Sequence, residues 1–186
     1  MDLERDERAA ALALLRTHAE RALEAHEAAM VADTIAFVEA HGDCLWRSCL
    51  PGHLTGSAWV VDAVRTRTLL THHRKLDKWL QLGGHADGDP DLLAVALREA
   101  REESGVKRLR AVSLEVFDVD RHWIPARGDV PGHYHYDLRF MIEADPAEPL
   151  AISDESHDLA WVEIARVTAL NPEESMARMV RKTAAR

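Results

Sequence analysis

The stretch that decides the fold of this chain is Gly84-His-Ala-Asp-Gly-Asp-Pro-Asp-Leu-Leu-Ala-Val-Ala-Leu-Arg-Glu-Ala-Arg-Glu-Glu-Ser-Gly-Val106. Near its end it carries three carboxylates, Glu99, Glu102 and Glu103, at spacings i, i+3 and i+4. In a helix these spacings place the side chains on one face. Like charges so placed repel one another, so a purely structural helix rarely has them. The pattern is therefore typical of a binding site.

A divalent cation in front of that face would remove the repulsion between the carboxylates. Hard oxygen ligands of this kind suit Mg²⁺ or Mn²⁺, and both ions also bind phosphate oxygens. The three glutamates therefore predict a site for Mg²⁺ or Mn²⁺.

The residues around the carboxylates predict a strand, a glycine loop and a helix. The strand-like residues 79–82 lead into a pair of glycines. Asp89 is expected to cap the helix and Pro90 to be its first residue, where its missing N–H costs nothing. Gly105, just after the acidic turn, is expected to end the helix.

The same stretch resembles the Nudix box, which reads Gly, five residues, Glu, seven residues, then Arg-Glu-U-x-Glu-Glu-x-Gly-U, with U a bulky apolar residue. Two positions depart: Pro90 stands where the pattern has its first Glu, and Ala100 is small for a U position. On this specific motif the chain is identified as a member of the Nudix hydrolase family. The matching residues are Gly84, Arg98, Glu99, Glu102, Glu103, Gly105 and Val106.

The resemblance implies a reaction and a role for each matching residue. The family hydrolyses a nucleoside diphosphate linked to another moiety, with Mg²⁺ or Mn²⁺ as cofactor. Glu102 and Glu103 would be the main metal ligands, and Glu99 would bind metal or act as the general base. The backbone carbonyl of Gly83 would be an extra ligand. Arg98 would hold the acidic cluster in place by an ion pair.

Two charged residues outside the box are further candidates. Glu155 precedes a late strand, in a loop where relatives place another metal ligand or the base, although a solvated loop carboxylate is the alternative. Arg139 could bind a substrate phosphate or form only a surface ion pair.

Histidines form a second candidate group. His133, His135 and Asp137 alternate along a predicted strand, so their side chains share one face. His133 and His135 could line the substrate pocket, or bind a second metal together with His85. The alternative is a polar sheet face with ordinary hydrogen bonds.

Composition bounds the class of protein. The chain has 186 residues, 47% of them hydrophobic and 30% charged, which is the composition of a soluble globular protein. Its net charge of −9 argues against a protein that coats nucleic acid. We find no apolar run of the roughly 20 residues that span a bilayer, and the acidic N-terminus is unlike a signal peptide. A cytoplasmic enzyme is therefore expected, with a small-molecule nucleoside diphosphate derivative as its partner, no nucleic acid polymer and no membrane.

The expected fold is an α/β/α sandwich with a mixed sheet, preceded by a helical segment. Residues 1–42 should form two helices, or one broken helix, packed on the core. Residues 43–186 should form the Nudix domain, and the resemblance allows a homodimer through the N-terminal helices. Strands are expected at residues 58–61, 68–71, 110–119, 133–142 and 159–162, and a last amphipathic helix at residues 172–184.

Two other functions remain open at this stage. One is an enzyme resembling isopentenyl diphosphate isomerase, which uses His and Glu metal ligands and a catalytic cysteine; Cys44 and Cys49 are the only cysteines. The other is a catalytically silent Nudix domain that senses a nucleotide. For a hydrolase, a nucleoside triphosphate, ADP-ribose, a sugar nucleotide and a dinucleoside polyphosphate all remain candidate substrates.

Overall fold

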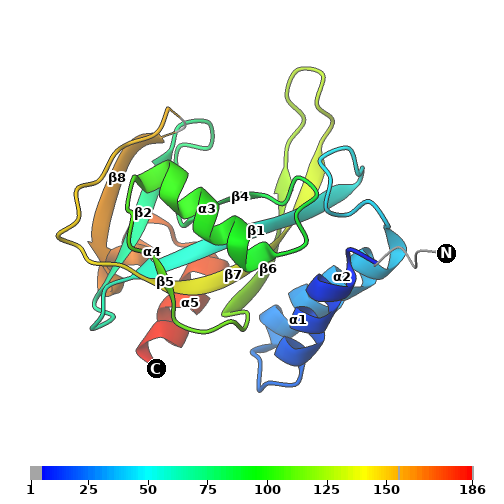
Figure 1. Ribbon diagram of the computed structural model, residues 1–186, viewed down its shortest axis with the longest axis horizontal. Coiled ribbons are helices and arrows are strands. Elements are labelled where there is room, and N and C mark those ends of the chain that lie inside the picture. The colour runs from blue at the N-terminus through cyan, green and yellow to red at the C-terminus, as the bar shows by residue number, and fades with distance from the viewer. Residues whose placement is uncertain (1–5, 155, 186) are drawn as a thin grey trace.

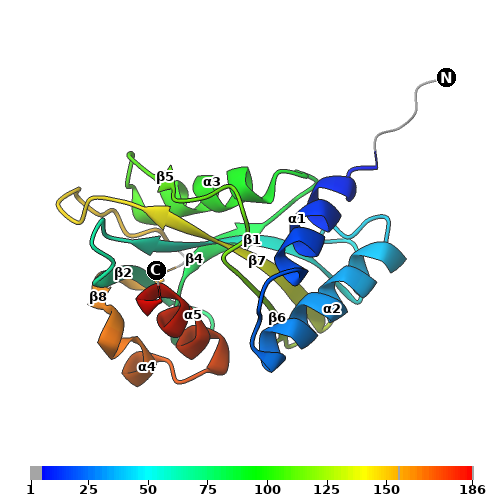
Figure 2. The same cartoon turned by 90° about the horizontal axis from the view of Figure 1, so that it is seen from below.

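A computed structural model describes residues 6–154 and 156–185 of the chain. It contains a curled mixed β-sheet with helices on both faces and two N-terminal helices at one end (Figures 1 and 2). The predicted α/β/α sandwich with an N-terminal helical segment is confirmed. None of the described helices is both long and apolar enough to cross a membrane.

The order of the elements follows the predicted alternation of strands around a central helix. The helices are α1 (Ala9–Ala19), α2 (Ala25–Ala40), α3 (Leu92–Ser104), the 3-10 turn η1 (Ile164–Arg166), α4 (Val167–Leu170) and α5 (Glu174–Ala184). The strands are β1 (Gly52–Val61), β2 (Arg67–His73), β3 (Lys78–Leu80), β4 (Leu82–His85), β5 (Arg110–Ala111), β6 (Asp118–Ile124), β7 (His133–Glu143) and β8 (Ser156–Glu163).

The sheet is built around the parallel pair β1 and β7. Its main path is β3-β2-β1-β7-β5, while β4 pairs with β1, β6 with β7, and β8 with β2. Each of the pairings other than β1 with β7 is antiparallel. Because β4 pairs with Thr55–Ala58 in the middle of β1, the glycine loop and α3 are brought beside the middle of the sheet.

Successive side chains of β1 point to opposite faces of the sheet, and each face carries its own apolar core. Leu54 and Ala58 belong to the core that contains α3, whereas Trp59 and Val61 belong to the core beneath α5. Figure 2 shows α3 on one side of the sheet and α4 and α5 on the other. On the α5 side, Met179 is fully buried, as the amphipathic pattern predicted.

The N-terminal helices share the core on the α3 side of the sheet. Leu15 of α1 and Val38 of α2 are fully buried there. The Phe37 ring stacks on Tyr136 of β7, with ring centroids 3.9 Å apart. Two helices, or one broken helix, were predicted within residues 1–42, and the structure has two, of which the second ends at Ala40. The domain boundary at residue 42 stays a prediction.

The start of α3 differs from the predicted one. The cap is Asp91, whose side chain accepts a hydrogen bond from the backbone N–H three residues on, at 3.0 Å. Asp89 instead accepts from the backbone N–H of Asp91 at 2.9 Å, and Pro90 lies before the helix. The prediction failed because both aspartates have the cap's chemistry and only the path of the loop selects one. Gly105 ends the helix at φ +71°, as predicted.

The strand predicted at residues 110–119 is also wrong in its extent. Only Arg110–Ala111 and the start of β6 at Asp118 are strand, although Val112 and Phe117 still donate backbone hydrogen bonds to β7. The intervening residues leave the sheet, and Leu114, one of the apolar residues of this segment, is 75% exposed. An alternating pattern therefore spanned a loop.

Candidate active site and a histidine cluster

The glycine pair brings the backbone of β4 against the glutamates of α3. Gly84 pairs with Gly56 of β1, and both glycines face the helix. A Cβ at Gly84 would collide with the carboxyl group of Glu99. A Cβ at Gly83 would lie 2.7 Å from the Cα of Ser57. At position 84 only glycine allows this close approach of β4 to α3, which explains why the motif needs glycine there.

Glu99 and Arg98 form an ion pair next to β4. Arg98 donates to the Glu99 carboxylate at 2.9 Å and to the backbone carbonyl of His85 at 3.2 Å. The Arg98 side chain thus ties the helix to the strand, which agrees with the holding role inferred from the motif. Burial raises the pKa of Glu99 above its ordinary value, although hydrogen bonding from Arg98 opposes the effect.

Glu103 and Glu102 differ in their surroundings. Glu103 is 8% exposed and accepts a hydrogen bond from the backbone N–H of Gly83 at 2.9 Å. Glu102 is exposed. The three glutamates offer the hard oxygen donors that a divalent ion needs, beside the Gly83 backbone. They do not all converge within 4.8 Å in this structure, in contrast to two other groups of side chains in the described residues.

One of those two groups consists of histidines on the opposite face of the sheet. His53, His85 and His135 come from β1, β4 and β7, and each offers a ring nitrogen within 4.8 Å of the others. His133 lies beside them, with its Nε2 3.3 Å from the Nε2 of His135. The structure therefore brings together His85, His133 and His135, the three histidines singled out from the sequence.

His53 completes this cluster and was missed by the sequence analysis. It pairs directly with His135 across the parallel strands β1 and β7. Burial lowers its pKa to about 4, and that of His135 also falls because of burial and the neighbouring imidazoles. Both rings are therefore neutral at pH 7. The signal available in the sequence was the alternation of His53, Thr55 and Ser57, three polar side chains on one face of an otherwise apolar strand.

Arg139 lies elsewhere than the sequence suggested. It is 3% exposed, and its guanidinium donates to Asp137 at 2.8 Å and to Asp118 at 3.2 Å. Of the two alternatives drawn from the sequence, the surface ion pair is wrong, because Arg139 is buried in a network of charges with β6 and α5. Its donors face aspartates in this structure rather than an open phosphate site.

That network also contains Arg178 of α5, which is fully buried and donates twice to Asp118, each time at 2.8 Å. Burial alone would raise the pKa of Asp118, but hydrogen bonding from Arg178 and the charge of Arg139 outweigh it and lower the pKa to about 2. Asp118 is therefore ionised at neutral pH and forms ion pairs with both arginines.

Glu155, the other candidate outside the motif, lies outside the described residues.

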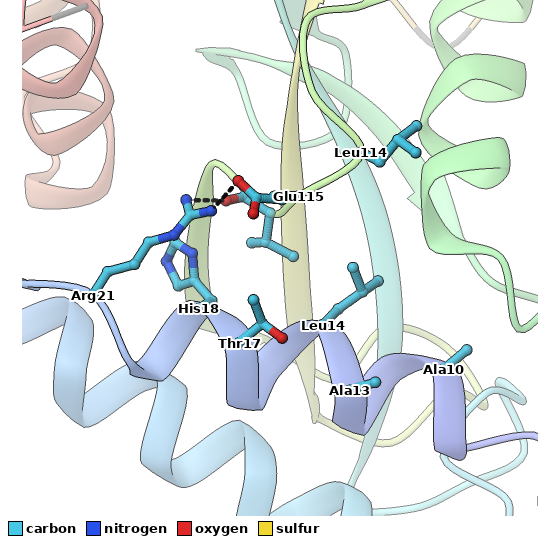
Figure 3. Close-up of a pocket in the computed structure, with 9 residues that line it drawn as sticks. Ala10, Ala13, Leu14, Thr17, His18, Arg21, Leu114 and Glu115 are labelled. Atoms are coloured by element: carbon cyan, nitrogen blue, oxygen red, sulfur yellow. Dashed lines mark hydrogen bonds and ion pairs between the residues drawn. The ribbon is translucent and has the colours of Figure 1, made fainter.

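A cavity of about 410 Å³ lies between α1 and residues 114–116 (Figure 3). It is lined by apolar side chains such as Leu14, and Arg21 closes one end by bonding to Glu115 and to the Val116 carbonyl at 3.2 Å. None of the candidate site residues that the structure describes lines it, so size alone does not mark the site.

Known proteins share a domain family and a fold with this chain. The family model for the NUDIX domain matches residues 53–183. The match covers more than half of the chain, so the protein belongs to the NUDIX family. It begins at β1 and leaves α1 and α2 outside. A comparison with curated protein sequences finds no significant match.

Solved structures with the same fold include several Nudix enzymes. An Ap4A hydrolase binary complex from C. elegans has a TM-score of 0.57 and 17% identity, over 71% of this chain and 95% of that one. The MutT protein from Methanosarcina mazei Go1 has a TM-score of 0.56 and 14% identity, over 71% and 92%. The E. coli dihydroneopterin triphosphate pyrophosphohydrolase has a TM-score of 0.54 and 14% identity, over 69% and 92%.

Family and fold together define a Nudix hydrolase, an enzyme that cleaves phosphoanhydride bonds. Enzymes of this family generally use divalent metal ions. At these identities the solved structures establish the fold alone, and the substrate depends on residues outside the motif.

Proposed function

We propose that this protein is a Mg²⁺- or Mn²⁺-dependent pyrophosphohydrolase that cleaves a nucleoside diphosphate linked to another moiety. The observation that carries the proposal is the seating of Glu99 and Glu103 against the backbone of Gly83 and Gly84. This arrangement supports the proposal by placing two carboxylates against the backbone of β4, with Arg98 paired to Glu99.

Each residue of the motif has a role in the proposed reaction. Glu102 and Glu103 would hold the metal, with the carbonyl of Gly83 as a further oxygen ligand. The bound ion supplies neutralisation of the phosphate charge and activation of the attacking water. Glu99 would bind metal or accept the proton of the water, a role that its raised pKa favours. Arg98 positions Glu99 and would not touch the substrate.

Other residues of the proposed site lie outside the α3 motif. The prediction that His85, His133 and His135 contact the substrate or line its pocket stays a proposal, although these histidines lie on the sheet face opposite α3. Glu155 stays a proposed ligand or base. Arg139 would act on the substrate only through its neighbours, because its own donors are engaged by aspartates.

The isomerase alternative is weakened by the two cysteines. Cys44 and Cys49 are both buried, and burial raises their pKa to about 11 and about 12. A thiol with such a pKa is almost fully protonated at pH 7 and is a poor nucleophile. Hydrolysis, which uses the glutamates and needs no thiol, is therefore the better proposal.

The test is a phosphate-release screen of the purified chain with Mg²⁺ and with Mn²⁺. The panel contains nucleoside triphosphates, dinucleoside polyphosphates, sugar nucleotides and ADP-ribose, which is bound by the NUDIX domain of Shewanella oneidensis NrtR, another solved structure similar to this chain. We expect metal-dependent hydrolysis of one of these classes. If the chain binds Mg²⁺ but hydrolyses no substrate of the panel, the hydrolase proposal is refuted and a nucleotide sensor is favoured.

Glu103→Gln is the informative variant. The Gln amide oxygen can still accept the hydrogen bond from Gly83, so the fold should survive while the charge is lost. We expect turnover to fall by at least two orders of magnitude. Glu163→Gln, an exposed carboxylate at the end of β8, is the matched control and should keep full activity. Equal loss in both variants would remove Glu103 from the metal site.

We also propose that the N-terminal helices α1 and α2 mediate a homodimer. Native mass spectrometry of the full chain at working concentration tests this proposal, and a monomeric mass would contradict it.

A further inference from the structure

The histidine cluster defined above lies on the sheet face opposite α3. His53 and His135 are register partners on β1 and β7, and His85 follows Gly84 on the neighbouring strand β4. Because side chains alternate along a strand, Gly84 faces Glu99 while His85 faces the other side. The histidines and the glutamates therefore belong to two separate groups of potential ligands.

The His53 ring is buried without a hydrogen-bond partner among the described residues. It is 3% exposed, and neither of its ring nitrogens has a hydrogen-bond partner within residues 6–154 and 156–185. Its ring lies about equally far from three other imidazoles, with centroids 5.0 Å from His85 and 4.9 Å from both His133 and His135. An unsatisfied buried polar group is costly, so such a group in the middle of a ligand-rich cluster points to a missing partner.

His133 is already oriented as a ligand. Its Nδ1 lies 2.8 Å from the carbonyl oxygen of Pro131, which can only accept, so Nδ1 carries the proton. In the neutral ring this leaves the lone pair on Nε2, which lies 3.3 Å from Nε2 of His135. Two imidazole nitrogens on one tetrahedral Zn²⁺ are separated by about 3.3 Å, given Zn–N bonds of about 2.0–2.1 Å. A carbonyl behind the ring is the usual support for a metal-binding histidine.

We propose that His53, His85 and His135, with His133 as a fourth ligand, bind one borderline transition-metal ion of the Zn²⁺ class. Imidazole nitrogens suit such an ion, whereas Mg²⁺ prefers oxygen. The three ring nitrogens lie within 4.8 Å of one another, so binding draws the rings inward to the tetrahedral spacing. The site is separate from the one proposed for the glutamates of α3.

The test is a titration of the chelator-treated full chain with Co²⁺, which substitutes for Zn²⁺ and absorbs visible light when it is tetrahedral. We expect one Co²⁺ per chain with this absorption, displaced by Zn²⁺, and a raised melting temperature. His53→Gln and His135→Gln should each weaken binding at least tenfold. Absence of the tetrahedral spectrum, or equal affinity in both variants and the wild type, would overturn the proposal.

Control variants separate this site from others. His157→Gln changes an exposed histidine outside the cluster and should bind as the wild type does. Cys49→Ser should also bind normally, although His41, Asp43 and Cys49 are a second group of potential ligands. Loss of Co²⁺ binding in Cys49→Ser, with retention in His135→Gln, would place the ion there and refute the histidine site.

Glu103→Gln distinguishes this proposal from the hydrolase proposal. It should abolish Mg²⁺-dependent hydrolysis and leave Co²⁺ binding unchanged, so the two proposals can fail independently. If His53→Gln does not fold, as judged by circular dichroism, His85→Gln provides the test, because His85 lies on a short strand and is only partly buried. Unchanged Co²⁺ affinity in His85→Gln would then count against the site.

Discussion

Replacing Arg178 with Met should lower the free energy of unfolding more than a substitution at the surface does. Arg178 is fully buried on α5 and donates to both oxygens of Asp118, at 2.8 Å each, and to the backbone carbonyl of Val119 at 2.9 Å. Met fills a similar volume but offers no donor. The substitution leaves a buried carboxylate with fewer partners, which is the costly way to break a buried ion pair.

The magnitude follows from the partners that remain. Removing one partner of a buried pair costs about 3–5 kcal/mol. Here Arg139 and Lys182 still contact Asp118, each at 3.2 Å, so we expect the lower end, about 3 kcal/mol. In a chain of this size each kcal/mol lowers the melting temperature by roughly 2–4 °C, which gives a fall on the order of 10 °C.

The matched control is Arg181→Met, three residues further along the same helix. Arg181 also pairs with two carboxylates, Glu24 at 2.6 Å and Glu174 at 2.5 Å, but its side chain is 45% exposed. Solvent screening limits such pairs to less than about 1 kcal/mol. The assay is urea unfolding followed by circular dichroism. A loss below 1 kcal/mol for Arg178→Met, or equal losses for both variants, would refute the argument that burial sets the cost.

Three further predictions concern stability and turnover. The pKa of Asp118 is lowered from 3.8 to about 2, and this shift adds roughly 2 kcal/mol to the free energy of unfolding. The contribution is fully present above about pH 4 and is lost as the pH falls toward 2. Acid unfolding of the wild type should show this loss, and acid unfolding of Asp118→Asn should not. Gly84→Ala should cut kcat at least tenfold by displacing the Glu99 carboxylate, with little change in melting temperature. Gly42 has open space around it, so the control Gly42→Ala should change neither kcat nor the melting temperature. Phe37→Ala should cost about 3–5 kcal/mol in urea unfolding, because the ring is only 5% exposed, and a cost below 1 kcal/mol would contradict the packing of α2 on the sheet.

The candidate site was predictable where its residues are close in sequence. Glu99, Glu102 and Glu103 share a helical face because of their spacing alone, and Arg98 beside them was correctly assigned to an ion pair with the cluster. His53 was not found, because its position next to His135 depends on the parallel pairing of two strands that are far apart in the chain. No local pattern records which strand will become the neighbour.

By itself the sequence determined the elements that local physics controls. The glycine pair, the helical spacing of the glutamates and the left-handed stop at Gly105 require no distant partner, and they were sufficient to identify the Nudix fold.

Only the tertiary structure decided which polar groups are buried together. From the sequence, Arg139 could bind a phosphate or form a surface ion pair, but in the structure it is buried and paired with Asp118 of β6. His53, on a strand that is buried throughout, meets His85 and His135 only when the sheet forms. The physical reason is the same in both cases. Burial and charge pairing arise from contacts between segments that are far apart in the chain, and these contacts set the pKa values and the ligand geometry.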